Sequence, residues 1–365
     1  MVALLQGSSV RVRVPASSAN IGPGFDSIGL ALGIWDEYVV TVTPEPALSI
    51  DVEGEGAGEL PCDERHLVHR SMVRAWEQLQ VQTPAGLHIS CRNAVPQGRG
   101  LGSSATAIVA GIVAAQGLCD IATGHEGADG DFDHAFANNL AAAIEGHPDN
   151  ASASVFGGMT LSWADDVDPG LIHSVQHEVV GDVIPLVFVP AAQLPTAIAR
   201  AALPDQIPLC LAALNSARVG LLVEAVTRRP ELLLAATREW LHQEQRRASF
   251  PDSMTLLDAL RGQGPAAVSP GSGPSRPVLR PRGPYRRPGN RTPFPLRRSR
   301  GTQRHGHRRP QHHGPGRRRL RQARGTLNCE LPTQLGNPAR KNSGRWSLDD
   351  DKPGGDPERR RRNLV

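Results

Sequence analysis

The segment VPQGRGLGSSATA, residues 95–107, combines three glycines with two adjacent serines. Glycine permits backbone conformations in which a Cβ would clash. An apolar run follows, so Gly102, Ser103 and Ser104 are expected at the N-terminus of a helix, where N–H groups lack intrahelical partners and carry the positive end of the dipole. The segment therefore predicts a phosphate-binding loop, with a serine-capped turn as the alternative. Unlike the familiar phosphate loop it has no lysine, so backbone N–H groups, Arg99 and a bound metal are expected to supply the charge.

Two other polar segments carry residues suited to chemistry. SSANIGPGFD, residues 17–26, places Asn20 and Asp26 on one glycine-punctuated turn, and EGHPDN ends a helical pattern with Glu145 and His147. One carboxylate beside bound phosphates suits Mg²⁺, which takes few protein oxygens and keeps phosphate and water ligands. On residue types alone, an ordinary turn and a capped helix end explain these segments as well.

The three segments together resemble a known family. PQGRGLGSSATA is similar to the phosphate loop of the GHMP kinases, and PASSANIGPGFDSIGLAL and EGHPDN resemble the homoserine kinases within that superfamily. The resemblance runs from about residue 10 to about residue 275. It implies ATP-dependent phosphorylation of the L-homoserine hydroxyl, a step of threonine biosynthesis, by a cytoplasmic homodimer that uses ATP and Mg²⁺.

The resemblance also implies roles for individual residues. Asn20 and Arg200 are expected to be catalytic, and Glu145 is expected to hold the metal together with a serine of the loop, either Ser103 or Ser104. No general base is assigned. The expected homoserine ligands are Asn20, Asp26, His147, Arg200 and Arg246, because guanidinium groups bind a carboxylate bidentately and residues 1–275 contain no lysine. The expected ATP ligands are Pro96, Gln97, Gly98, Arg99, Gly100, Leu101, Gly102, Ser103, Ser104, Ala105 and Thr106.

The sequence departs from the family at two of these positions. Residues 243–246 read Gln-Glu-Gln-Arg, where many relatives have Glu-Pro-Tyr-Arg, and the loop between Glu145 and His147 is shorter than in some relatives. The substrate role of Arg246 and the alignment of His147 therefore rest on weaker matches than the phosphate loop does.

Hydrophobic spacing places these segments between regular elements. Strands are expected at 10–16, 38–43, 47–54, 86–93, 154–163 and 183–190, and helices at 63–80, 104–119, 132–146, 195–203, 207–226, 230–248 and 253–264. The expected fold is α+β. The resemblance implies a GHMP kinase N-terminal domain, residues 1–160, with a left-handed βαβ crossover, and a truncated ferredoxin-like C-terminal domain, residues 161–275.

Charge divides the 365-residue chain near residue 275. Residues 1–275 hold 15 arginines, no lysine and 30 acidic residues, a net charge of −15, whereas residues 276–365 hold 25 basic and 6 acidic residues, a net charge of +19. No strand or helix pattern is expected after Ser275, and the Arg/Pro/Gly-rich tail is predicted to be disordered because it cannot bury enough surface. Such a run is typical of GC-rich coding DNA read in a shifted frame. The alternative is a native basic arm that binds nucleic acid non-specifically.

Other features exclude several classes of protein. The five cysteines are scattered and form no C-x-x-C pair, which argues against a disulfide scaffold or a cysteine zinc site. No apolar run reaches the roughly 18 residues of a membrane span, so no membrane partner is expected. Two alternatives to homoserine kinase stay open, namely a GHMP kinase for another small alcohol and a non-catalytic binding protein with a basic tail.

Overall fold

The computed structural model describes residues 3–125, 131–191, 196–268, 275–281, 296–298 and 326–330. Its larger sheet has the strand order β11-β1-β2-β4-β3, and β5 and β6 extend it from the start of β2. β3 and β4 pair in parallel with α1 between them in the chain, and β1 pairs in parallel with β11. The strands are β1 (Ser9–Ala19), β2 (Ile28–Val42), β3 (Leu48–Gly54), β4 (Leu87–Asn93), β5 (Met159–Ala164), β6 (Ile172–His177) and β11 (Thr326–Glu330).

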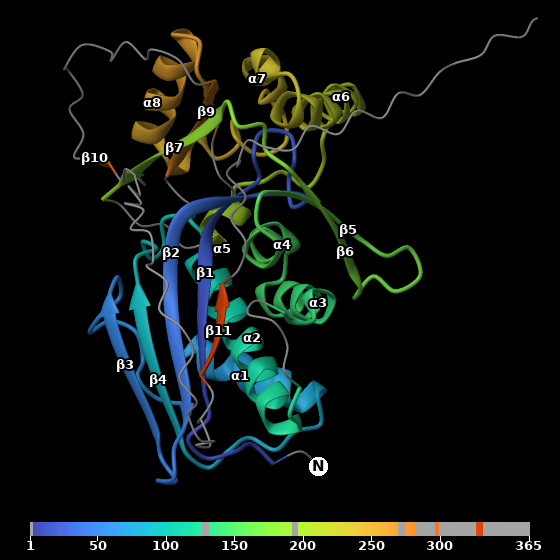
Figure 1. Ribbon diagram of the computed structural model, residues 1–365. Helices are drawn as coiled ribbons and strands as arrows, with labels where there is room; N and C mark the ends of the chain where they lie inside the picture. The colour runs from blue at the N-terminus through green and yellow to red at the C-terminus, as the bar shows by residue number, and fades with distance from the viewer. Residues whose placement is uncertain are drawn as a thin grey trace, which may run out of the picture.

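Four helices cover one face of this sheet (Figure 1). They are α1 (Leu67–Gln78), α2 (Ser103–Thr123), α3 (His134–Glu145) and α4 (Pro148–Phe156). The sequence of α2 is apolar all round because the helix lies in the core between the strands and α1. The two helices approach closely at Gly111, where a Cβ would lie 2.4 Å from the Val68 carbonyl oxygen. Buried Trp76 of α1 also donates its indole N–H to the Ala115 carbonyl at 3.2 Å.

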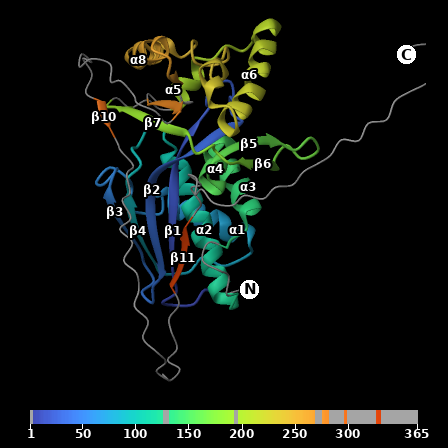
Figure 2. The same cartoon turned by 45° about the horizontal axis from the view of Figure 1, so that its top comes forward.

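A smaller antiparallel sheet and four helices form the second part of the molecule. Its strand order is β10-β7-β9-β8, and it lies at one end of the larger sheet in both views (Figures 1 and 2). The elements are β7 (Val183–Pro190), α5 (Thr196–Ala201), α6 (Leu209–Thr227), α7 (Leu233–Ala236), α8 (Pro251–Gly262), β8 (Ala266–Ala267), β9 (Arg276–Pro281) and β10 (Leu296–Arg298). The mixed α+β class is therefore confirmed, whereas the left-handed crossover and the ferredoxin-like arrangement stay predictions.

Two helices of the described residues have the length and mean hydropathy of a membrane span. α2 is 72% buried inside the protein over its most apolar window, as a core helix should be, but α6 is only 22% buried. Leu209 and Leu214 of α6 are 85% and 46% exposed.

The predicted helix at 230–248 is wrong beyond its first turns. The chain forms a short 3-10 turn, Pro230–Leu232, then α7, and from Thr237 it is irregular up to a second 3-10 turn, Arg247–Ser249. The cause is the carboxylate of Glu239, which accepts N–H groups from the three residues at 241–243. A side chain that binds nearby backbone donors competes with the helical hydrogen bonds. The predicted strand at 154–163 is also wrong in its first half, since α4 continues to Phe156.

The prediction that no strand follows Ser275 is wrong. β9 lies between β7 and β8, and its Pro277, Val278 and Leu279 are buried. The prolines at 277 and 281 argue against a strand when only the sequence is considered, because proline is unusual inside a sheet. β10 pairs with β7, and β11 pairs with β1, so one edge of each of these two strands is covered by residues after Ser275. The remainder of the predicted disordered tail lies outside the described residues.

Candidate active site

The predicted phosphate loop connects the end of β4 to the start of α2. Gly98, Gly100 and Gly102 all have positive φ, at 62°, 73° and 70°. At Gly102 a Cβ would lie 2.2 Å from Ser17 Oγ, so this position needs glycine for space as well as for conformation. Gly102 is the N-cap of α2 and supplies no side-chain cap. The first-turn N–H groups of this helix therefore have no acceptor from the cap side chain, as a helix N-terminus that binds an anion requires.

Burial separates the predicted ATP ligands into two groups. Leu101, Gly102, Ala105 and Thr106 are buried, whereas the segment 96–100, Ser103 and Ser104 are partly or fully exposed. The Thr106 hydroxyl donates to Asp36 at 2.7 Å and lies close to the Ser103 carbonyl at 2.9 Å. Because Thr106 is fully buried, its side chain anchors α2 instead of facing a ligand.

The predicted metal ligand Glu145 meets a serine of the loop. Its carboxylate accepts the hydroxyl of Ser104 at 2.5 Å, and it is this serine, not Ser103, that α2 presents to it. Burial raises the pKa of Glu145 above its ordinary value, against the opposing effects of the Ser104 hydrogen bond and of His147. No set of three or more His, Cys, Asp or Glu side chains that could hold a metal occurs among the described residues. One carboxylate and one hydroxyl fit Mg²⁺, whose remaining ligands come from phosphates and water.

Asn20 and His147 both bind Asp149, a residue of the EGHPDN segment that was not predicted to belong to the site. Asp149 is fully buried, accepts Asn20 Nδ2 at 2.9 Å and hydrogen-bonds His147 Nδ1 at 2.6 Å. Burial acts to lower the pKa of His147, but the hydrogen bond to Asp149 and the charges of Asp149 and Glu145 outweigh it and the pKa is raised. The charged form of this histidine is therefore stabilised relative to that of a free imidazole.

Asp26 and Arg200 form an ion pair at the rim of the same region. The Arg200 Nη2 and Nη1 atoms donate to the two carboxylate oxygens of Asp26, at 2.8 and 3.1 Å, and the Asp26 N–H donates to Asn20 Oδ1 at 2.7 Å. Asn20 and Asp26 have left-handed φ values of 55° and 53°. The turn thus places the side chains of Asn20 and Asp26 in one site.

Arg246 completes the cluster from the irregular segment after α7. Its guanidinium lies 5.8 Å from the centre of the Phe25 ring, and that of Arg200 lies 5.9 Å from the same centre. Burial, together with the nearby charge of Arg200, lowers the pKa of Arg246 to about 10. All five predicted homoserine ligands therefore lie in one connected region, with two guanidinium groups beside a single aromatic ring.

Residues that the sequence did not predict hold the turn at residues 20–26 in place. His242 is fully buried and hydrogen-bonds the Gly22 carbonyl through Nε2 at 3.0 Å, and Asn215 of α6 donates to the Pro23 carbonyl at 3.0 Å. The carboxylate of Glu239 organises the backbone around His242. No local sequence pattern predicts the contacts of His242 with Gly22 and of Asn215 with Pro23, because they join positions about 200 residues apart in the chain.

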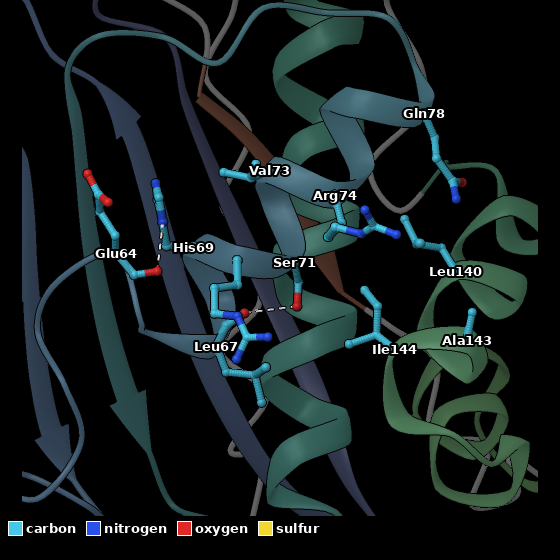
Figure 3. Close-up of a pocket in the computed structure, with 11 residues that line it drawn as sticks. Glu64, Leu67, His69, Ser71, Val73, Arg74, Gln78, Leu140, Ala143 and Ile144 are labelled. Carbon is cyan, nitrogen blue, oxygen red and sulfur yellow. Dashed lines mark hydrogen bonds between the residues drawn. The ribbon is translucent and has the colours of Figure 1, made fainter.

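A separate groove of about 580 Å³ runs between α1 and α3. Side chains of α1, Arg74 and Gln78 among them, face Leu140 and Ile144 of α3 across it (Figure 3). It contains none of the predicted site residues.

Comparison with known proteins decides the family. Residues 67–158 match the GHMP kinases N terminal domain. The homoserine kinase of Streptomyces avermitilis is 49% identical over 270 residues, which cover 74% of this chain and 85% of that protein. The chain belongs to the homoserine kinase family. A second family member, from Cutibacterium acnes, is 45% identical over 269 residues, covering 73% of this chain and 88% of its own length.

Solved structures agree with this membership. The crystal structure of homoserine kinase from Cytophaga hutchinsonii has a TM-score of 0.63 at 27% identity and covers 76% of this chain and 87% of its own. A putative homoserine kinase from Listeria monocytogenes has a TM-score of 0.56 at 30% identity, with coverages of 74% and 86%. A mevalonate diphosphate decarboxylase from Legionella pneumophila, 17% identical with a TM-score of 0.54 and coverages of 75% and 93%, shares the fold. The resemblance and the GHMP kinase fold expected from the sequence are thus confirmed.

Proposed function

We propose that this chain transfers the γ-phosphoryl group of ATP to the hydroxyl of L-homoserine. The observation that carries the proposal is the Asp26–Arg200 ion pair beside Arg246, at 2.8 Å in its closer contact. Homoserine is a zwitterion, so its ammonium group can take Asp26 and its carboxylate can take the two arginines. An amino-acid substrate would thereby replace an existing charge pair with two charge-assisted contacts.

The phosphate loop supplies the other half of the reaction. The N–H groups at the start of α2 bind the phosphates, and Glu145 with Ser104 would hold Mg²⁺, which neutralises charge on the transferring group when bound. Burial raises the pKa of Glu145. A cation bound there would oppose that rise, because it stabilises the charged carboxylate. Asn20 and His147 orient the substrate hydroxyl in line with the γ-phosphorus, so positioning and charge stabilisation provide most of the rate.

The test is a coupled assay with ATP, using L-homoserine and mevalonate as separate acceptors. Turnover with homoserine alone is expected, and turnover with mevalonate alone would assign the chain to another GHMP kinase activity. Arg200→Lys should raise the homoserine KM at least tenfold and leave the ATP KM nearly unchanged, because a single ammonium cannot replace the planar fork. Arg228→Lys is the matched control, since Arg228 is 77% exposed and pairs only with Glu224 among the described residues. A raised ATP KM with an unchanged homoserine KM in Arg200→Lys would contradict the assignment of Arg200 to homoserine binding.

The homodimer, the cytoplasmic location and the magnesium requirement stay predictions. Sedimentation at several protein concentrations tests the first. Loss of turnover on chelation, with recovery on adding Mg²⁺, tests the last.

A further inference from the structure

Asp36 lies within β2 with a fully buried side chain, and the reaction proposed above gives it no role. Its Oδ1 accepts the backbone N–H groups of Ala94 and Val95, at 2.7 and 2.9 Å. Its Oδ2 accepts the hydroxyls of Thr106 and Tyr38, at 2.7 and 3.2 Å. One carboxylate therefore binds four donors.

Three of these donors flank the phosphate loop. Ala94 and Val95 directly follow the last residue of β4, and Thr106 lies in the first turn of α2. The intervening glycines have positive φ and little intrinsic stiffness. A side chain on a third element, β2, thus joins the start of the loop to the first turn of α2.

The energetic cost of this arrangement indicates more than packing. A buried carboxylate without a cation is expensive, and among the described residues no arginine or histidine forms an ion pair with Asp36. Burial raises the pKa of Asp36, and the hydrogen bonds from Thr106, Val95 and Ala94 oppose that rise. The hydrogen bonds from Ala94, Val95 and Thr106 therefore also offset part of the cost of burying this carboxylate.

We propose that Asp36 is a positioning residue for nucleotide binding, which holds the first turn of α2 so that its N–H groups meet the phosphates. The inference rests on the proposed role of the loop in binding ATP. Thr106 is the link between the carboxylate and the helix, and its own hydroxyl is buried away from any ligand.

The experiment compares Thr106→Val, which keeps the side-chain shape and removes the hydroxyl, with Thr106→Ser, which keeps the hydroxyl. Tyr38→Phe is the comparison variant, because it removes a bond to the same carboxylate and a neighbour of the Thr106 hydroxyl but keeps the bond from Thr106 to Asp36. Asp36→Asn and the double variant Asp36→Asn/Thr106→Val complete the set. Calorimetry gives the Kd of Mg·ADP, turnover gives the homoserine KM, and urea titration gives stability.

Thr106→Val and Asp36→Asn should weaken Mg·ADP binding at least fivefold and change the homoserine KM less than twofold. Thr106→Ser should bind Mg·ADP as the unmodified chain does, and the Kd of Tyr38→Phe should stay within twofold of the unmodified value. The Kd of the double variant should be no higher than that of the single variant that binds Mg·ADP less tightly. The proposal is overturned if Thr106→Val and Tyr38→Phe lose stability alike while Mg·ADP affinity stays unchanged, or if Thr106→Ser fails to rescue. If the unmodified chain binds Mg·ADP but never phosphorylates homoserine, the proposed function fails while this inference is still decided by the Kd values.

Discussion

Gly102→Ala tests whether the phosphate loop needs glycine because of its close approach to Ser17. The added Cβ would lie 2.2 Å from Ser17 Oγ and 3.2 Å from Asn150 Oδ1, at a φ of 70°. Ser17 Oγ now donates to Asn150 Oδ1 at 2.9 Å inside the protein, so making room for the Cβ breaks that hydrogen bond. The substitution combines backbone strain with a lost buried contact.

The two contributions can be separated at the other end of the same helix. Gly124, the C-cap of α2, also has a φ of 70°, but nothing lies within 4 Å of its added Cβ. Gly124→Ala should therefore cost only the left-handed strain, about 1–2 kcal/mol. Gly102→Ala should add about 1–3 kcal/mol for the buried acceptor left without its partner, a total of about 2–5 kcal/mol.

Urea unfolding of both variants and calorimetry with Mg·ADP measure these effects. We expect Gly102→Ala to lower both stability and nucleotide affinity, and Gly124→Ala to leave affinity unchanged. Ser17→Ala should cost much less stability in the Gly102→Ala background than in the unmodified chain, because the hydrogen bond to Asn150 is already broken there. Equal stability losses in the two glycine variants, with Mg·ADP affinity intact in both, would refute the reasoning.

Three further predictions concern other parts of the chain. Truncation after Ser275 should cost about 3–6 kcal/mol more than truncation after Pro281, because it removes the buried apolar side chains of β9; equal urea midpoints would contradict the placement of β9. The raised pKa of His147 gives stability that is fully present below about pH 6.5 and is lost as pH rises through the folded pKa. His147→Gln should therefore flatten the dependence of the unfolding free energy on pH. An unaltered curve would exclude this linkage. A thiol reagent should modify exposed Cys62 quickly and Cys91 only on unfolding, since burial raises the Cys91 pKa to about 12; mass spectrometry of the labelled peptides checks this, and early labelling of Cys91 would disprove it.

The parts of the site that could be predicted are those with a local cause. The phosphate loop was predictable because glycines, serines and an apolar helix follow one another directly. Asp36 was not, because nothing near it in the sequence shows that three of its four partners lie 58 to 70 residues away. Such contacts depend on how strands and helices pack, which periodicity does not specify.

The same limit explains the errors in the second part of the molecule. Residues 230–248 have helical spacing, but Glu239 binds the backbone N–H groups that a helix would use. β9 has only two consecutive apolar residues, Val278 and Leu279, between prolines, yet β7 and β8 supply enough neighbours to bury them. In both cases tertiary contacts override the local preference.

The left-handed backbone at Asn20 and Asp26 has a consequence for engineering. Such conformations cost non-glycine residues of order 1 kcal/mol each, although Asn and Asp tolerate them better than most. Selection of variants for thermal stability alone would therefore be drawn to glycine at these two positions, and it would discard the amide and the carboxylate that bind Asp149 and Arg200. A campaign to stabilise this enzyme should hold both positions fixed and seek its gains elsewhere.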